Sequence, residues 1–256
     1  GCFNLDDNSG RLLIRGADCR VVTFGVNQRR AEVRARGIRL EPDRVRFLVD
    51  TPQETLPVTV PIPGRFTAYN ALGALACCYG LGIPLAKAIQ ALEKVPPVKG
   101  RLEVVPVPAP YTVVIDYAHT PDALEQVLAD ARRVTQGRLI CLFGCGGDRD
   151  KTKRPVMGEI AASLSDLVIL TSDNPRTEDP EAILDQVAAG FPRGFADYHR
   201  EPDRRAAIAL ALSLGRAGDV ILLAGKGHET YQEIGKNRLP LDEREEIASF
   251  FQKSKV

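Results

Sequence analysis

Four apolar runs in the second half of the chain constrain its fold more than any other feature. They cover residues 111–116, 139–143, 167–170 and 220–224. Strands that are apolar along their whole length need cover on both faces, as the strands of a parallel sheet have. Segments with helical apolar spacing lie among and after these runs, at residues 120–131, 179–187 and 242–251. Alternation of this kind predicts a doubly wound, Rossmann-like α/β domain.

The first part of the chain has a different pattern. Short apolar stretches separated by Asn, Asp and Gly turns predict five strands, at residues 11–15, 21–24, 31–40, 45–49 and 55–62. Helical spacing follows at residues 71–79, and a second helix is expected to begin at Pro84. Pro96-Pro97 ends that helix. The sequence therefore predicts two domains, residues 1–98 and 99–256, which a length of 256 residues allows.

Composition excludes several classes of partner. The net charge is +1, from 34 basic and 33 acidic residues, so no global field favours nucleic acid or an anionic membrane. No apolar run is long enough to span a bilayer, and the first residues do not resemble a secretory signal. The six cysteines form no Cys-x-x-Cys pair and predict reduced thiols in a cytoplasmic protein. The three histidines are scattered, so no metal site is expected.

Polar loops follow the apolar runs, where the ligands of doubly wound domains bind. In the loop 116–121, Asp116 is a candidate for a ribose hydroxyl and His119 for phosphate, although an Asx turn leading into a helix cap is the favoured interpretation of this loop taken alone. The loop 143–155 combines three glycines with four cations, which suits a carboxylate or a phosphate. A solvated charged loop would explain its cations but not its glycines. It is not a Walker A loop, because neither Gly-Lys pair of the chain precedes Ser or Thr.

The two remaining loops suit the zwitterionic end of an amino acid. Asp173 can accept from an ammonium group, Asn174 can bridge, and Arg176 can pair with a carboxylate. Asn174-Pro175 is also a common turn former. Farther on, Gly225 allows a close backbone approach and Glu229 adds a second carboxylate. One glycine loop of this kind is weak evidence, but four polar loops on one expected rim favour a binding site.

Several motifs resemble those of the Mur ligases, and most closely the diaminopimelate-adding members. In the order of that family, they are residues 64–70, 100–103, 116–121, 143–155, 173–176 and 225–229. The resemblance covers essentially the whole chain and implies an ATP- and Mg²⁺-dependent amide ligase of peptidoglycan precursor synthesis, and so of cell-wall biogenesis, cell shape and division. Such enzymes phosphorylate the D-glutamyl carboxylate of UDP-N-acetylmuramoyl-L-alanyl-D-glutamate, and the amine of meso-diaminopimelate then attacks the acyl phosphate. The expected protein is a cytoplasmic monomer with small-molecule partners.

The resemblance also implies residue roles. It implies ATP contacts at Asn70, Arg101, Asp116 and His119. It implies diaminopimelate contacts at Arg149, Asp173, Asn174, Pro175, Arg176, Gly225 and Glu229. The family usually has Asn where this chain has Thr67, which removes one expected adenine contact.

The family's amino-terminal domain, its P-loop and its carbamylated lysine are expected to precede Gly1. Residues 1–98 then correspond to the trailing part of a P-loop-type central ATP-binding domain. No residue here is assigned a catalytic role, and the 256-residue chain alone is expected to be inactive.

Other functions remain open. A lysine-adding Mur ligase is disfavoured, because lysine brings no second carboxylate for Arg176. A folylpolyglutamate synthetase is not expected to carry the Gly-Gly-Asp-Arg-Asp-Lys loop. The chain could also be a ligand-binding fragment without catalysis. A dehydrogenase is disfavoured, since no Gly-x-Gly-x-x-Gly follows a strand.

Overall fold

The computed structural model describes residues 1–41 and 43–253, and the chain divides into two compact units, Gly1–Pro97 and Val98–Val256. The division falls one residue before the expected boundary. Each unit has its own sheet and its own core.

Unit 1 is built on a five-stranded sheet with the order β1-β2-β3-β4-β5. The first three strands pair in parallel and the last three are antiparallel. Its strands are β1 (Cys2–Asn4), β2 (Val22–Gly25), β3 (Val33–Leu40), β4 (Val45–Asp50) and β5 (Thr55–Val60). Helices α2 (Arg65–Gly80) and α3 (Leu85–Leu92) pack on this sheet in one apolar core.

The strand expected at residues 11–15 is wrong, because helix α1 (Asn8–Ile14) covers most of this segment. Asp7 caps the helix by accepting a hydrogen bond from the Ser9 backbone N–H at 2.7 Å. Leu12 and Leu13, which suggested a strand, are both exposed on the helix. The capping residue therefore decided the local structure, and the apolar pair did not.

Unit 2 contains a six-stranded sheet with the order β10-β9-β8-β11-β7-β6. All its neighbouring strands pair in parallel except β6 with β7. The strands are β6 (Glu103–Val105), β7 (Thr112–Asp116), β8 (Leu139–Phe143), β9 (Leu167–Leu170), β10 (Tyr198–Arg200) and β11 (Val220–Ala224). The four apolar runs of the sequence are thus β7, β8, β9 and β11, and the predicted doubly wound fold is confirmed.

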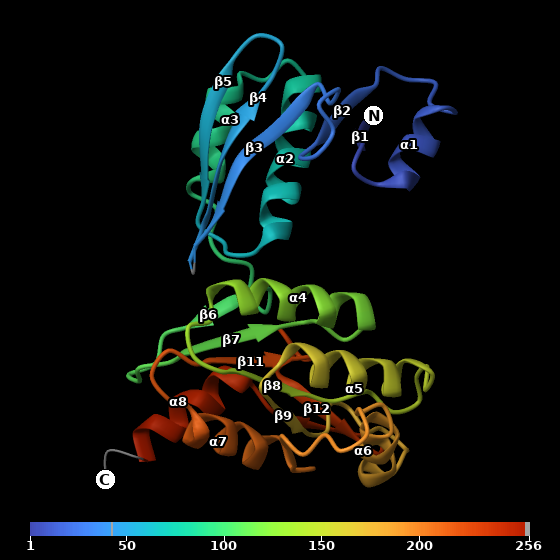
Figure 1. The fold of residues 1–256 in the computed structure, drawn as a ribbon, viewed down its shortest axis with the longest axis vertical. Helices are drawn as coiled ribbons and strands as arrows, with labels where there is room; N and C mark the ends of the chain where they lie inside the picture. Colours follow the sequence, from blue (N-terminus) through green and yellow to red (C-terminus); the bar gives the residue numbers. More distant parts are fainter. Residues whose placement is uncertain (42, 254–256) are drawn as a thin grey trace. The chain divides into compact units, whose positions relative to one another are not determined.

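Helices cover both faces of this sheet (Figure 1). One face carries α4 (Pro121–Val134), α5 (Lys153–Leu164) and α6 (Pro180–Ala188). The other face carries α7 (Arg204–Leu214) and α8 (Glu243–Lys253). Successive strand residues alternate between the two cores, so that Val114 packs with the first group and Ile115 with the second. Two-sided cover explains why these strands are apolar throughout.

A small hairpin follows the sheet and was not predicted. It pairs β12 (Tyr231–Ile234) with β13 (Asn237–Pro240) in antiparallel register. Gly235, in the two-residue turn, has a φ of +59°, which glycine adopts without strain. Strands β6 and β10 and helix α7 were also not predicted, since their short or nearly continuous apolar patterns have no clear period.

All six cysteines are free. Burial raises the pKa of Cys141 and of Cys145 to about 12, so both thiols stay protonated at neutral pH. Neither thiol is therefore a nucleophile.

Candidate functional site

The four polar loops lie at one edge of the sheet of unit 2, because β7, β8, β9 and β11 run in parallel. Direct contacts join them. The Gly147 backbone N–H donates to the Asn174 carbonyl at 2.8 Å, and the Gly225 N–H donates to the Asp116 carbonyl at 3.0 Å. The structure thus brings together candidate residues more than 100 positions apart in the sequence.

Glycines allow the second and third loops to pack backbone against backbone. A Cβ atom built on Gly144 would lie 2.1 Å from the Thr171 carbonyl oxygen, and one on Gly147 would lie 1.9 Å from that of Pro175. No side chain fits such gaps. The glycines of the loop 143–155 therefore hold the Asp173–Arg176 segment in place.

A buried lysine connects the third and fourth loops. The Lys226 side chain has no exposed surface. Its Nζ donates to Asn174 Oδ1 at 3.0 Å and to Glu229 Oε2 at 2.9 Å, and lies 3.5 Å from Asp173 Oδ1. Asn174 Nδ2 in turn donates to Glu229 Oε2 at 3.0 Å. Both candidate carboxylates thus lie around one internal cation.

Two arginines flank Gly146 on the other side of the loop. A Cβ built there would meet Arg176 Nη1 at 3.1 Å and Arg149 Cγ at 3.7 Å. Arg176 Nε donates to Glu233 Oε2 at 2.8 Å, and Nη1 donates to the Gly147 carbonyl at 2.8 Å. Arg149 is exposed and pairs with no acidic side chain in the described part of the chain. A ligand carboxylate could therefore pair with Arg149 and with the remaining donors of Arg176.

Arg176 adopts an unusual backbone conformation, with a φ of +52°. This left-handed region is costly for a side chain of this size. Two backbone hydrogen bonds to the hairpin hold it there, from Arg176 N–H to Glu233 O and from Gly235 N–H to Arg176 O. The hairpin thus fixes the direction in which the guanidinium points.

The other three cations of the loop 143–155 have partners inside the protein. Arg154 is fully buried and donates to both carboxylate oxygens of Glu178, each at 2.9 Å. Lys151 lies 3.0 Å from the same carboxylate. The hydrogen bonds from Arg154, with further help from the Asp148 N–H, lower the pKa of Glu178 to about 2. Lys153 donates to the His119 carbonyl at 2.6 Å. Of the four, only Arg149 is available to a ligand without breaking such a contact.

The first loop forms the Asx turn that was the favoured interpretation of Asp116. Its Oδ1 accepts from the Ala118 N–H at 2.8 Å and its Oδ2 accepts from the Leu102 N–H at 2.7 Å. Burial raises the pKa of this carboxyl, against the effect of the two backbone bonds. A ribose hydroxyl would have to share these oxygens, so the ribose contact stays a prediction.

Tyr117 is the centre of an aromatic and cationic group that sequence reasoning missed. The rings of His119 and His228 lie 4.6 Å and 4.9 Å from its ring, and the Arg101 guanidinium lies 5.1 Å from its centroid. The structure therefore places Arg101 and His119, both candidates for ATP, around one tyrosine. The position of Tyr117 within the candidate loop 116–121 could have identified it as a site residue from the sequence.

Asn70, the fourth ATP candidate, lies in unit 1. It is exposed and lines a cavity of about 620 Å³, together with Asp6, Phe24, Phe66 and others. Tyr69 also lines this cavity, and aromatic rings beside an amide suit a flat, hydrogen-bonding group such as a base. Thr67 is buried and its hydroxyl donates to the Pro63 carbonyl at 2.7 Å, so it is already used within the protein.

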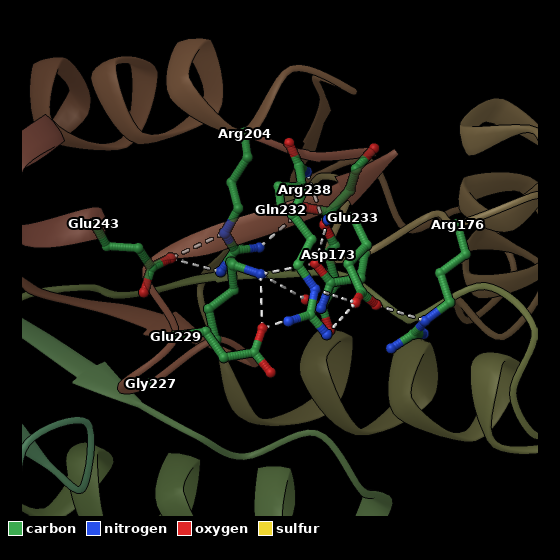
Figure 2. Close-up of polar contacts among 12 residues, drawn as sticks. Asp173, Arg176, Arg204, Gly227, Glu229, Gln232, Glu233, Arg238 and Glu243 are labelled. Carbon is green, nitrogen blue, oxygen red and sulfur yellow. Dashed lines mark hydrogen bonds and ion pairs between the residues drawn. The ribbon is translucent and has the colours of Figure 1, made fainter. Parts of the chain in front are cut away.

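A second buried ion pair holds the ends of the strands. Arg204 Nη2 lies 2.7 Å from Glu243 Oε1, and both side chains are fully buried. The same guanidinium donates to the carbonyls of Ser172 and Ala224, at 3.2 Å and 3.0 Å. Figure 2 shows Arg204 reaching Glu243 on one side of the cluster and Arg176 reaching Glu233 on the other. Arg204 therefore fixes the starts of the third and fourth loops.

Sequence reasoning missed Lys226 and Glu233 for different reasons. Lys226 lies inside the candidate loop 225–229, but its sequence context suggests only a test for a Walker lysine, and its burial is not visible in the sequence. Glu233 lies on the hairpin, whose Gly-Lys turn between two alternating stretches was a usable signal.

No group of three or more His, Cys, Asp or Glu side chains within residues 1–41 and 43–253 is arranged to hold a metal ion. The Mg²⁺ that the resemblance implies therefore has no fitting carboxylate cluster in this part of the chain, and no step is assigned to it. None of the described helices is long and apolar enough to cross a bilayer.

Known protein families match both units. Residues 1–78 match the Mur ligase middle domain, and residues 100–227 match the Mur ligase glutamate ligase domain. The UDP-N-acetylmuramoyl-L-alanyl-D-glutamate–2,6-diaminopimelate ligase of Clostridioides difficile strain 630 is 44% identical over 246 residues, which cover 95% of this chain and 51% of that protein. The ligase of the same name from Bacillus velezensis is 43% identical over 95% of this chain and 49% of its own length. The chain thus spans about half the length of these curated relatives.

Solved structures of ligases also match this chain. A structure of a UDP-N-acetylmuramoyl-L-alanyl-D-glutamate–2,6-diaminopimelate ligase matches with a TM-score of 0.70 and 35% identity, over 100% of this chain and 53% of that one. A folylpolyglutamate synthase of Mycobacterium tuberculosis, solved with ADP and AMPPCP, matches with a TM-score of 0.67 over 85% of this chain and 50% of its own. At 19% identity, the second match shows a shared fold alone.

Proposed function

Because the chain belongs to the Mur ligase family, we propose that it serves in an ATP-dependent ligase that adds meso-diaminopimelate to UDP-N-acetylmuramoyl-L-alanyl-D-glutamate. In this reaction the D-glutamyl carboxylate takes the γ-phosphoryl group of ATP, and ADP leaves. The amine of diaminopimelate then attacks the acyl carbon, phosphate leaves, and the nitrogen loses a proton as the amide forms.

One observation in particular supports diaminopimelate as the amino acid. Unit 2 places carboxylates that can accept from an ammonium, Asp173 and Glu229, in one loop cluster with the guanidinium of Arg176. Acceptors and a guanidinium at one strand edge are what a zwitterionic amino-acid end requires. Curated relatives that are 43–44% identical over 95% of this chain are named as diaminopimelate ligases.

The ATP contacts are proposed from the surroundings of four residues. Asn70 lines a cavity with three aromatic residues, which suits adenine. Arg101 lies beside Tyr117 with its guanidinium exposed, which suits phosphate oxygens. His119 is exposed on the same tyrosine. Asp116 would share with a ribose the oxygens that accept from the backbone. A cytoplasmic location and a monomeric state also remain predictions.

Two rival functions make different demands on the site. A lysine-adding ligase would leave the guanidiniums of Arg149 and Arg176 without the second carboxylate that diaminopimelate has and lysine lacks. A folylpolyglutamate synthetase would have to accept glutamate, which has no second ammonium. The identity of the amino acid that unit 2 binds therefore distinguishes the proposed function from both alternatives.

The test is an amide-forming assay with the protein translated from the complete reading frame that encodes this chain. With ATP, Mg²⁺ and the UDP-linked dipeptide, we expect ADP release that depends on meso-diaminopimelate, and a product larger by one diaminopimelate residue in mass spectrometry. The 256-residue chain alone is the control and is expected to release no ADP, since it contains no Walker A sequence. Equal turnover with lysine, or turnover with glutamate instead, would reject the proposal.

A further inference from the structure

We propose that Lys226 is a positioning residue that sets the charge of the amino-acid site, so that the site binds one ammonium group without first losing a proton. The inference rests on the proposed function, because it assumes that Asp173 and Glu229 receive a ligand amine. It adds a residue to that site and assigns to it an electrostatic task.

The geometry places Lys226 behind the two carboxylates. Lys226 is fully buried, while the side chains of Asp173 and Glu229 are 11% and 17% exposed. The ammonium group has three donors, and its neighbours are Asn174, Glu229 and Asp173. The centroid of the Tyr231 ring lies 5.7 Å from Nζ. A ligand can therefore approach the carboxylates but cannot displace Lys226 without unfolding the loops.

Charge decides what such a site can bind. Asp173, Glu229 and Lys226 together carry a net charge of −1 when ionised, which matches one ammonium group. Without Lys226, two carboxylates that each lie within 3.5 Å of its Nζ would lose the cation between them, and like charges in such a place favour a shared proton. A ligand ammonium would then have to displace that proton. Lys226 removes this cost and also holds the third and fourth loops together.

The experiment is calorimetric titration of meso-diaminopimelate into the 256-residue chain at pH 7, in two buffers of different ionisation enthalpy. The number of protons exchanged on binding follows from the difference between the buffers. For the unmodified chain we expect binding with almost no net proton exchange. For Lys226→Met we expect affinity lower by roughly tenfold or more, because a buried charge loses its partner. Its binding should also release close to one proton, a signal that the loss of a structural contact would not produce.

Two further variants complete the design. Lys236→Met removes an exposed lysine in the turn between β12 and β13 and should match the unmodified chain in affinity and protons. Lys226→Met combined with Glu229→Gln restores a net charge of −1, so it should bind more weakly but release no proton. Circular dichroism checks the fold of each. Should Lys226→Met alone fail to fold, the double variant is expected to fold, because it no longer holds two carboxylates without a cation between them.

The outcomes separate the two hypotheses. No binding to the unmodified chain would reject the amino-acid site itself, and with it the proposed function. Binding to the unmodified chain with equal affinity in Lys226→Met would overturn only the role of Lys226. Weaker binding by Lys226→Met without proton release would also overturn only the role of Lys226. So would a double variant that stays unfolded or that still releases a proton on binding.

Discussion

Arg176 combines a strained backbone, with a φ of +52°, and a guanidinium already paired with Glu233. Such strain persists where the surrounding structure holds it, here through the hairpin. In the complete protein, Arg176→Ala should lower the specificity constant for diaminopimelate. The decrease should correspond to the loss of about 2–5 kcal/mol of interaction with the distal carboxylate of the amino acid. Use of lysine should change much less.

Arg176→Lys should restore only part of the loss, because an ammonium keeps the charge but not the planar fork. The measurement is the ratio of specificity constants for the two amino acids in the three proteins. An unchanged ratio in Arg176→Ala would move the selection to Arg149, which has no acidic partner among the described residues.

Glu178 gives a prediction on pH. Its pKa falls from an ordinary 4.5 to about 2 on folding, chiefly through Arg154. A lowered pKa stabilises the fold above pH 4.5, and this contribution is lost as the pH falls from 4.5 toward 2. Glu178→Gln should therefore be less stable than the unmodified chain at pH 7, by roughly 1–3 kcal/mol.

The difference between the two proteins should shrink at pH 3, as measured by urea unfolding at both pH values. Glu125→Gln, an exposed change in α4, is the control and should show no such trend. If the difference in the free energy of unfolding stayed constant with pH, the contact between Arg154 and Glu178 would stabilise the fold without the charge of Glu178.

At the scale of elements, the packing of the loops 143–155 and 171–176 depends on glycine. In Gly147→Ala the new Cβ would lie 1.9 Å from the Pro175 carbonyl oxygen, so one backbone must move. We expect a loss of roughly 1–3 kcal/mol in the free energy of unfolding and weaker binding of diaminopimelate. Gly16→Ala, which has nothing within 4 Å and no positive φ, should lose no stability. Equal stability of the two variants in thermal unfolding would show that the loops are not held by this contact.

The elements also show what the sequence could predict. The strands β7, β8, β9 and β11 were predictable because a strand buried on both faces is apolar throughout. That their loops meet followed from parallel pairing. The partners of the site residues were not predictable, because Lys226 and Glu233 reach Asn174 and Arg176 from positions 52 and 57 residues away. The strand predicted at residues 11–15 was wrong because the prediction rested on the apolar stretch and did not include the helix cap at Asp7.

At the scale of the whole chain, the two units differ in how their sheets are covered. In unit 2, both faces of the sheet carry helices and two apolar cores. In unit 1, α2 and α3 share a single core with the sheet. Amide exchange should therefore be slowest in β7, β8 and β11 and faster in unit 1. Mass spectrometry of peptides after deuterium labelling measures this, and equal protection of both sheets would contradict it.

We propose that unit 2 binds diaminopimelate through the loops 143–155, 172–176 and 225–229. The most direct test is a nuclear magnetic resonance titration of the ¹⁵N-labelled chain with meso-diaminopimelate and, separately, with lysine. We expect shift changes at the amides of these loops, among them Gly147, Asn174 and Gly225, at diaminopimelate concentrations where lysine causes none. Changes elsewhere only, or the same changes with lysine, would contradict it.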